Sequence, residues 1–226
     1  MKRLITLVNI LIIIFGITSF AGATLIDRGG GLIYDDDLDI TWLQDANYPY
    51  TSGYQTQYDG RMGWEQAMNW AENLIYESYD DWRLPSALNL DGSGPCGPLP
   101  NQPNLGYNCN GSEMGHLYYV ELGNDVSSVP HFEPFINVEK NLNYSAAYWS
   151  NTEYAKVSIN YAWNFAFLVG GYQNFSPMSS YLFAWAVRDG DVASLPEPSP
   201  VPEPSTMLLL GSGLAGITLL RKRLKA

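Results

Sequence analysis

The sequence predicts an α+β protein with a mainly antiparallel sheet, two helices and long loops. Three observations predict this fold class: extended aromatic-rich segments near both ends of the central region, two segments with helical spacing between them, and a long stretch rich in glycine, proline and asparagine. Strands and helices that are segregated along a chain are typical of α+β domains, whereas regular alternation is typical of parallel α/β folds.

The first elements are predicted to be three short strands. Residues 24–28 and 31–34 flank a glycine turn at 29–31, and residues 40–43 form the next extended segment. β-branched and aromatic residues bounded by glycine and aspartate favour strands joined by tight turns.

Two helices are predicted to follow. Apolar side chains recur every three or four residues over 64–75, which indicates an amphipathic helix, and Glu65 suits its first turn. Ser112 is a good N-cap for a second helix that continues to Leu122 and ends at Gly123. Residues 83–111 are expected to be mostly loop.

The last third is predicted to be β structure. It starts at 148–150, and over 162–167 small residues alternate with Trp163, Phe165 and Phe167, which predicts a strand with one bulky face. Gly170 and Gly171 turn the chain, and residues 181–188 are expected to form the closing strand.

The N-terminal 23 residues have the pattern of a signal peptide. Lys2 and Arg3 precede an apolar run over 4–20, and Ala21 and Ala23 supply the small residues at a cleavage site after Ala23. An uncleaved anchor helix is the alternative interpretation. Either way, the pattern predicts export.

The C-terminus has three parts in a fixed order. A proline-rich spacer over 194–206 contains Pro202, Glu203 and Pro204, an apolar helix is expected over 207–220, and residues 221–226 are basic. This order resembles the PEP-CTERM sorting signal that exosortase-type enzymes process. The resemblance implies an exported envelope or extracellular protein that its C-terminal helix anchors transiently in the inner membrane, with the basic tail in the cytoplasm. A permanent tail anchor is the alternative.

The remaining body, residues 24–193, is the size of one domain and strongly acidic. It holds six of the 12 basic residues and 21 of the 23 acidic residues, which gives a net charge of −15. A surface with this charge repels phosphate backbones, so no nucleic-acid partner is expected. The body also holds all seven Trp and all sixteen Tyr residues. Most of these rings are expected in the core, and exposed ones can stack on the apolar faces of sugars.

Cys96 and Cys109 are the only cysteines and enclose a loop rich in proline, glycine and asparagine. Export places them in an oxidising compartment, where a disulfide is expected, with two free thiols as the alternative. A metal site at these cysteines is less expected, because His116 and His131 are the only histidines in the chain.

Calcium is the candidate cofactor, at two places. Asp35, Asp37 and Asp39 crowd one turn with Asp36, and such carboxylates repel one another unless a cation or open water relieves them. Asn89, Asp91 and Ser93 match the first ligand positions of an EF-hand-type loop, but the position of its final glutamate is Pro100. The alternatives are a solvated acidic turn and a glycine–serine turn.

Several motifs of the body recur in the order found in one family. The body resembles the Lcl C-terminal domain family, named for bacterial collagen-like adhesins, through the segments Gly31-Leu32-Ile33-Tyr34-Asp35, Thr41-Trp42, Trp64-Glu65-Gln66-Ala67, Asp81-Trp82-Arg83-Leu84-Pro85-Ser86, Tyr148-Trp149-Ser150 and Ala186-Val187-Arg188. The resemblance implies a C-type-lectin-like domain, related to formylglycine-generating enzymes, whose N- and C-terminal strands pair.

Three residues of these motifs are expected to be structural. Trp82 and Trp149 are expected to fill the core. Arg83 is expected to be partly buried in an ion pair with Asp81 or Glu153, because a buried guanidinium needs a carboxylate partner.

Family and motifs together favour a protein without enzymatic activity that binds polysaccharide or other surface components. No nucleophile elbow, zinc-protease motif or phosphate loop is present, so no catalytic residue is predicted. The alternatives are a secreted carbohydrate-active enzyme, which needs only two suitably placed carboxylates, and a purely structural matrix component.

Overall fold

The computed structural model describes residues 24–55, 57–97, 106–139, 146–154, 160–168 and 170–192. Two antiparallel sheets and a few short helices make up this part of the chain. The α+β class with mainly antiparallel sheets is therefore confirmed.

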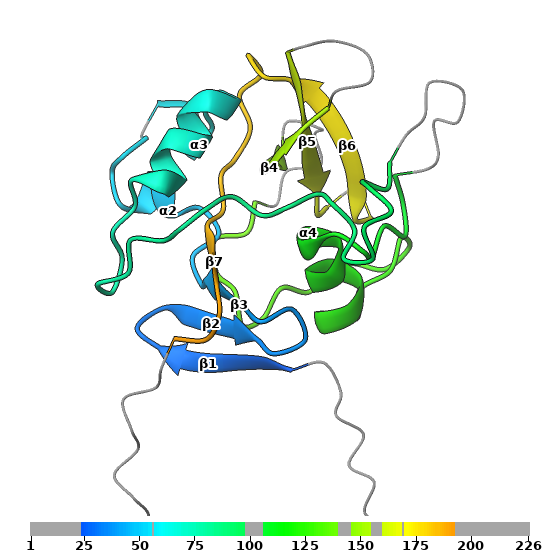
Figure 1. Cartoon of the computed structure of the whole chain (residues 1–226), viewed down its shortest axis with the longest axis horizontal. Coiled ribbons are helices and arrows are strands. Elements are labelled where there is room, and N and C mark those ends of the chain that lie inside the picture. Colours follow the sequence, from blue (N-terminus) through cyan, green and yellow to red (C-terminus); the bar gives the residue numbers. More distant parts are fainter. Residues whose placement is uncertain are drawn as a thin grey trace, which may run out of the picture. The chain divides into compact units, whose positions relative to one another are not determined.

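The first sheet joins the two ends of the body. Its strands are β1 (Leu25–Gly29), β2 (Leu32–Asp35), β3 (Ile40–Leu43) and β7 (Val187–Asp189), in the order β1-β2-β3-β7. Every neighbouring pair is antiparallel, and Trp42 of β3 faces Val187 of β7 in the register. Figure 1 shows β7, from the end of the described body, beside the N-terminal strands. The closing strand is thus shorter than predicted and joins the sheet through β3.

The second sheet has three strands in chain order. β4 (Ala147–Glu153) pairs with β5 (Tyr161–Ala166), which pairs with β6 (Tyr172–Pro177). β5 is buried on both faces, not only on the bulky one, because Ala162 and Asn164 are as inaccessible as Phe165. β6 was not expected from the sequence.

Five short helical segments complete the described fold. They are α2 (Tyr48–Thr51), the 3-10 turn η1 (Gln57–Gly60), α3 (Trp64–Glu72), α4 (Glu113–His116) and the π-helical turn η2 (Leu117–Glu121). α3 buries Ala67, Trp70 and Ala71, as its apolar spacing requires. Ser112 caps α4 by accepting a hydrogen bond from the backbone N–H of Gly115 at 3.2 Å.

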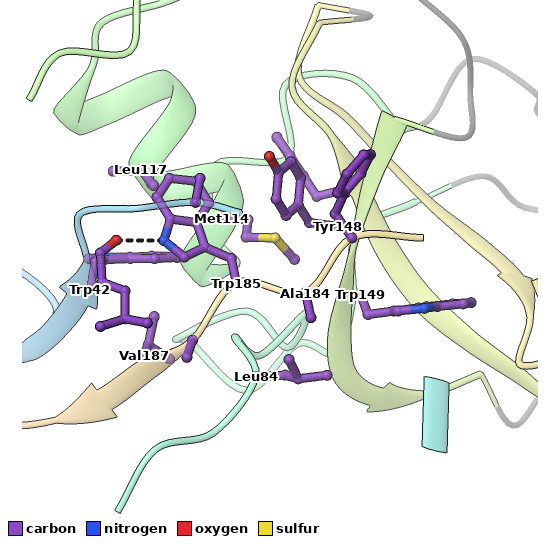
Figure 2. Close-up of a cluster of buried hydrophobic side chains, with 14 of the residues drawn as sticks. Trp42, Leu84, Met114, Leu117, Tyr148, Trp149, Ala184, Trp185 and Val187 are labelled. Carbon is purple, nitrogen blue, oxygen red and sulfur yellow. Dashed lines mark hydrogen bonds between the residues drawn. The ribbon is translucent and has the colours of Figure 1, made fainter. Parts of the chain in front are cut away.

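Large aromatic side chains fill the core between these elements (Figure 2). Trp42, Trp149 and Trp185 are fully buried, and the rings of Trp42 and Trp185 meet edge to face with centroids 5.2 Å apart. The indole N–H of Trp185 donates to the carbonyl of Leu43 at 2.7 Å, and that of Trp149 donates to the carbonyl of Met62 at 2.9 Å. These bonds satisfy the polar edges of two large buried rings.

Candidate functional site

A surface hollow lies beside the N-terminal end of α3. This hollow, which we call the α3–β6 hollow, has a volume of about 670 Å³, within the range of ligand pockets, and its lining includes Glu65, Gln66, Asn160, Tyr161, Ser179 and Tyr181. The rings of Tyr58 and Tyr181 lie against each other with centroids 4.6 Å apart, and they are 46% and 47% exposed. The hollow therefore offers exposed aromatic faces beside amide and hydroxyl groups.

A second hollow lies against the same helix. The α2–α3 hollow has a volume of about 440 Å³ and is lined in part by Tyr48, Tyr54, Asn69, Trp70, Asn73 and Ile75. Gln66, Asn69 and Asn73 are all exposed and follow one another at helical spacing. They form what we call the amide stripe, which runs about 10 Å along α3 and its C-cap at 1.5 Å of rise per residue, from Gln66 in the α3–β6 hollow to Asn69 and Asn73 in the α2–α3 hollow.

The acidic turn after β2 directs its predicted calcium ligands to different places. Asp35 is fully buried, and its Oδ1 accepts a hydrogen bond from the backbone N–H of Leu38 at 3.0 Å. Asp37 lies beside His116, with 3.7 Å between Oδ2 and Nε2. Asp39 instead accepts a hydrogen bond from the hydroxyl of Tyr34 at 2.9 Å. The structure therefore brings Asp35 and Asp37, but not Asp39, toward one point.

Two further residues at that point were missed by the sequence analysis. His116 ends α4 and Glu121 ends η2, and His116 Nε2 lies 3.4 Å from Glu121 Oε1. Ligand atoms of Asp35, His116 and Glu121 all lie within 4.8 Å of one another. Burial, followed by the charges of Asp35 and Asp37, raises the pKa of Glu121 to about 7. The only sequence signal was that His116 is one of two histidines.

Residues 89–93 form a compact turn in the structure. Asn89 donates through Nδ2 to the hydroxyl of Ser93 at 2.9 Å, and the backbone N–H of Ser93 donates to Asp91 Oδ1 at 2.9 Å. Hydrogen bonding from the Ser93 hydroxyl, followed by that from its backbone N–H, lowers the pKa of Asp91, whose side chain is exposed. The three predicted ligands thus bond one another within the turn, as in an Asx turn.

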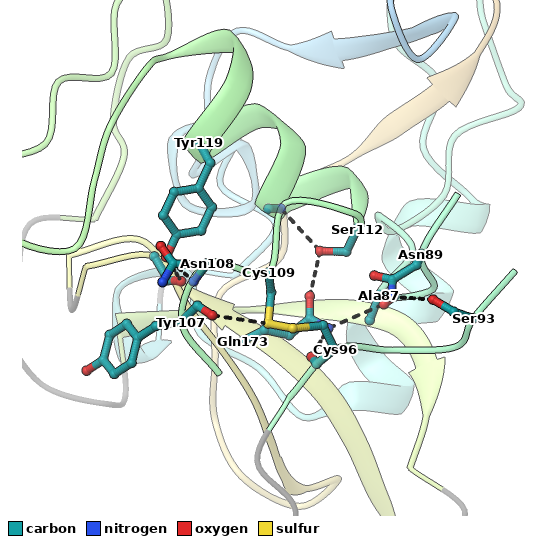
Figure 3. Close-up of a disulfide and its surroundings, with 12 residues drawn as sticks. Ala87, Asn89, Ser93, Cys96, Tyr107, Asn108, Cys109, Ser112, Tyr119 and Gln173 are labelled. Atoms are coloured by element: carbon teal, nitrogen blue, oxygen red, sulfur yellow. Dashed lines mark hydrogen bonds between the residues drawn. A yellow bond between two sulfur atoms is a disulfide. The ribbon is translucent and has the colours of Figure 1, made fainter. Parts of the chain in front are cut away.

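Cys96 and Cys109 form a disulfide, with Cα atoms 5.5 Å apart (Figure 3). The buried side chain of Gln173 on β6 donates to the carbonyls of Cys96 and Ala87, and it accepts a hydrogen bond from the Ser112 hydroxyl. The N-cap of α4, the disulfide loop and the second sheet therefore meet at Gln173.

The three predicted structural residues lie inside the body. Trp82 and Trp149 are buried. Arg83 binds Glu113 with two hydrogen bonds, at 2.9 Å through Nη1 and 2.8 Å through Nη2, and its Nε donates to Asp189 at 3.0 Å. The prediction that Asp81 or Glu153 forms the ion pair with Arg83 is wrong. Asp81 pairs with Arg188, and Glu113 on α4 pairs with Arg83.

Comparison with known families and proteins identifies the C-terminus alone. Residues 200–223 match the PEP-CTERM protein-sorting motif, which includes Pro202, Glu203 and Pro204. No curated protein and no solved structure matched the chain. The motif indicates an exported protein that is directed to the cell envelope and processed by an exosortase.

Several predicted features lie outside the described residues. They are the signal peptide with Ala21 and Ala23, the proline-rich spacer, the apolar helix over 207–220 and the basic tail. Within the part of the chain that the structure describes, no helix is long and apolar enough to cross a membrane.

Proposed function

We propose that this exported, exosortase-sorted protein binds polysaccharide at the face of α3, without enzymatic activity. The observation that carries the proposal is the amide stripe, whose residues line two hollows that both contain tyrosines. Sugar rings present an apolar face to aromatic side chains and hydroxyl groups to amides, so this combination suits an extended glycan.

The acidic residues of this face support binding rather than hydrolysis. Among the described residues, Glu65 is the only acid that lines the α3–β6 hollow, and no acid lines the α2–α3 hollow. A glycosidase that acts through the usual mechanism needs two carboxyl groups about 5–10 Å apart across the scissile bond. A single carboxylate can orient a sugar hydroxyl but cannot serve both roles.

The charge of the body favours a neutral glycan. With 21 acidic and six basic residues in 24–193, the protein repels sulfated or carboxylated polymers at low salt. We therefore propose a neutral polysaccharide of the envelope or matrix as the ligand.

Glycan arrays and pull-down with the producing cell's own exopolysaccharide test this proposal. We expect Tyr181→Ala and Asn69→Ala to weaken binding about fivefold each, because stacking and hydrogen-bonding contacts contribute on the order of 1 kcal/mol. Tyr50→Ala is the matched control, because Tyr50 is also an exposed tyrosine (45%) but lines neither hollow. Binding that is absent in the unmodified protein, or unchanged in both hollow variants, contradicts the proposal, and polysaccharide cleavage would identify an enzyme instead.

A further inference from the structure

The polar cluster between the acidic turn and the second helical segment has an excess of buried acceptors. The side chain of Glu121 is 0% exposed, and neither of its carboxylate oxygens has a hydrogen-bond partner. Asp35 is equally buried, and its Oδ2 makes no hydrogen bond, although the indole N–H of Trp42, which also makes none, lies near its carboxylate. Nε2 of His116 makes no hydrogen bond either. Buried polar groups in native proteins are nearly always satisfied, so four unpartnered atoms in one cluster need an explanation.

The negative charge of the cluster also needs an explanation. Asp35 and Glu121 are both buried acids, and Asp37 and Asp36 add further negative charge nearby. Of the four arginines within the described residues, Arg28, Arg83 and Arg188 pair with acids elsewhere, and Arg61 donates to the carbonyl of Tyr58. A divalent cation would satisfy the oxygens and neutralise the charge together.

The geometry of the cluster fits a transition metal. Ligand atoms bound at ~2.1 Å in a tetrahedral zinc site lie about 3.4 Å apart. His116 Nε2 lies 3.4 Å from Glu121 Oε1 and 3.7 Å from Asp37 Oδ2. The widest ligand separations among Asp35, His116 and Glu121 stay within 4.8 Å, which rotation of a side chain can close.

The local backbone explains how the two helical ligands meet. His116 and Glu121 are five positions apart, and the backbone N–H of Leu122 donates to the carbonyl of Leu117 at 3.0 Å, five residues back. This i→i+5 bonding widens the helix, so residues five apart face the same side, and π-helical turns occur frequently at functional sites. In a regular α-helix they would point in different directions.

We propose that Asp35, His116 and Glu121 bind one divalent transition-metal ion together with Asp37, which lies at the solvent-exposed side of the cluster. Zn²⁺ fits this site best. An imidazole ligand favours zinc and its neighbours over calcium, which takes oxygen ligands only. Three buried ligands and Asp37, whose side chain is 46% exposed, give the four-ligand set of a structural site. The ion links the turn after β2 to α4 and η2.

Metal titration of the native exported protein, purified without a polyhistidine tag and stripped with a chelator, tests the proposal. We expect one Zn²⁺ per chain by calorimetry and elemental analysis, and a higher unfolding temperature with Zn²⁺ but not with Ca²⁺. Glu121→Gln and His116→Gln should each weaken binding about 100-fold and abolish the thermal shift, whereas Glu72→Gln, an exposed acid on α3, should change neither.

Two features keep the test decisive. Glu121→Gln removes a buried charge, so the metal-free variant should remain folded by circular dichroism, and Asp37→Asn at the solvent-exposed side should weaken binding about tenfold without affecting the fold. Failure of the unmodified protein to bind Zn²⁺ stoichiometrically would overturn the proposal. Equal binding by the Glu121 and His116 variants, or stabilisation by Ca²⁺ alone, would overturn it as well.

Discussion

Arg83 shows how one side chain joins segments that are far apart in the sequence. Its backbone N–H donates to the carbonyl of Val187 at 2.8 Å, and the N–H of Val187 donates back at 2.9 Å. Its guanidinium binds Glu113 on α4 and Asp189 on β7. Glu113 also accepts a hydrogen bond from the backbone N–H of Ser86 at 2.7 Å. The Trp-Arg-Leu-Pro-Ser segment is thereby fixed to both β7 and α4.

Glu113→Ala should therefore lower the stability of the folded protein. It leaves a mostly buried guanidinium with one exposed partner, and we expect a loss of about 2–3 kcal/mol in the free energy of unfolding, measured by urea denaturation. Asp189→Asn is the control, because the side chain of Asp189 is 77% exposed and the pair should contribute less than about 1 kcal/mol. A Glu113 variant as stable as this control would refute the structural role.

The pair of Asp81 and Arg188 predicts a pH dependence. The hydrogen bond from Arg188 lowers the pKa of Asp81. The folded state therefore favours the ionised carboxylate, and this contribution is present above the ordinary aspartate pKa of about 3.9 and is lost as the pH falls through the lowered value. In urea denaturation between pH 5 and 2.5, Asp81→Asn should lose stability less steeply than the unmodified protein. Asp80→Asn, an exposed neighbour, should retain the full slope.

The cluster of Asp35, His116 and Glu121 shows which residues of a site could not be predicted from the sequence. The crowding of Asp35 with its neighbours pointed to a cation from local spacing alone. His116 and Glu121 lie about 80 positions later, and their approach depends on a π-helical turn that no apolar pattern encodes. Local charge can thus suggest half of such a cluster, whereas the other half requires the tertiary fold.

At the scale of elements, strongly patterned segments were predictable and polar ones were not. The N-terminal strands and α3 carry clear apolar or β-branched patterns, and the structure has elements at those places. β6 has the sequence Tyr-Gln-Asn-Phe-Ser-Pro, with no regular alternation and a proline at its end. It is a strand because its full length pairs with β5 at the edge of the sheet, where proline is tolerated.

The disulfide element gives a prediction of its own. Replacing Cys96 and Cys109 by serine opens a loop with a sequence separation of 13, and we expect a loss of about 3 kcal/mol in unfolding free energy. Val129→Ala is the control and should cost less than about 0.5 kcal/mol, as exposed surface changes usually do, because Val129 is 93% exposed. Urea denaturation with and without a reducing agent measures both, and an unchanged midpoint in the double variant would contradict the expectation.

At the scale of the whole molecule, the sorting motif predicts the fate of the C-terminus. If an exosortase processes the chain, the native exported protein should lack the apolar run over 207–220, whereas Pro202→Ala/Pro204→Ala should retain it. Mass spectrometry of the C-terminal peptide from each strain measures the difference. Pro196→Ala/Pro198→Ala, which precede the matched residues 200–223, are the control and should be processed normally. An intact C-terminus in the unmodified exported protein would mean a permanent anchor.

The pairing of β7 with β3 has a consequence for secretion. The last strand of the body completes a sheet that begins at its first strand, and Arg28 on β1 reaches Asp191, just past β7, at 2.9 Å. A chain that threads through a translocation pore from its N-terminus leaves the β3 edge open until residue 187 has emerged, and open edges invite pairing with other chains. Stalled or clipped molecules that end before this strand should therefore aggregate or be degraded, so that only fully translocated chains reach a stable native state.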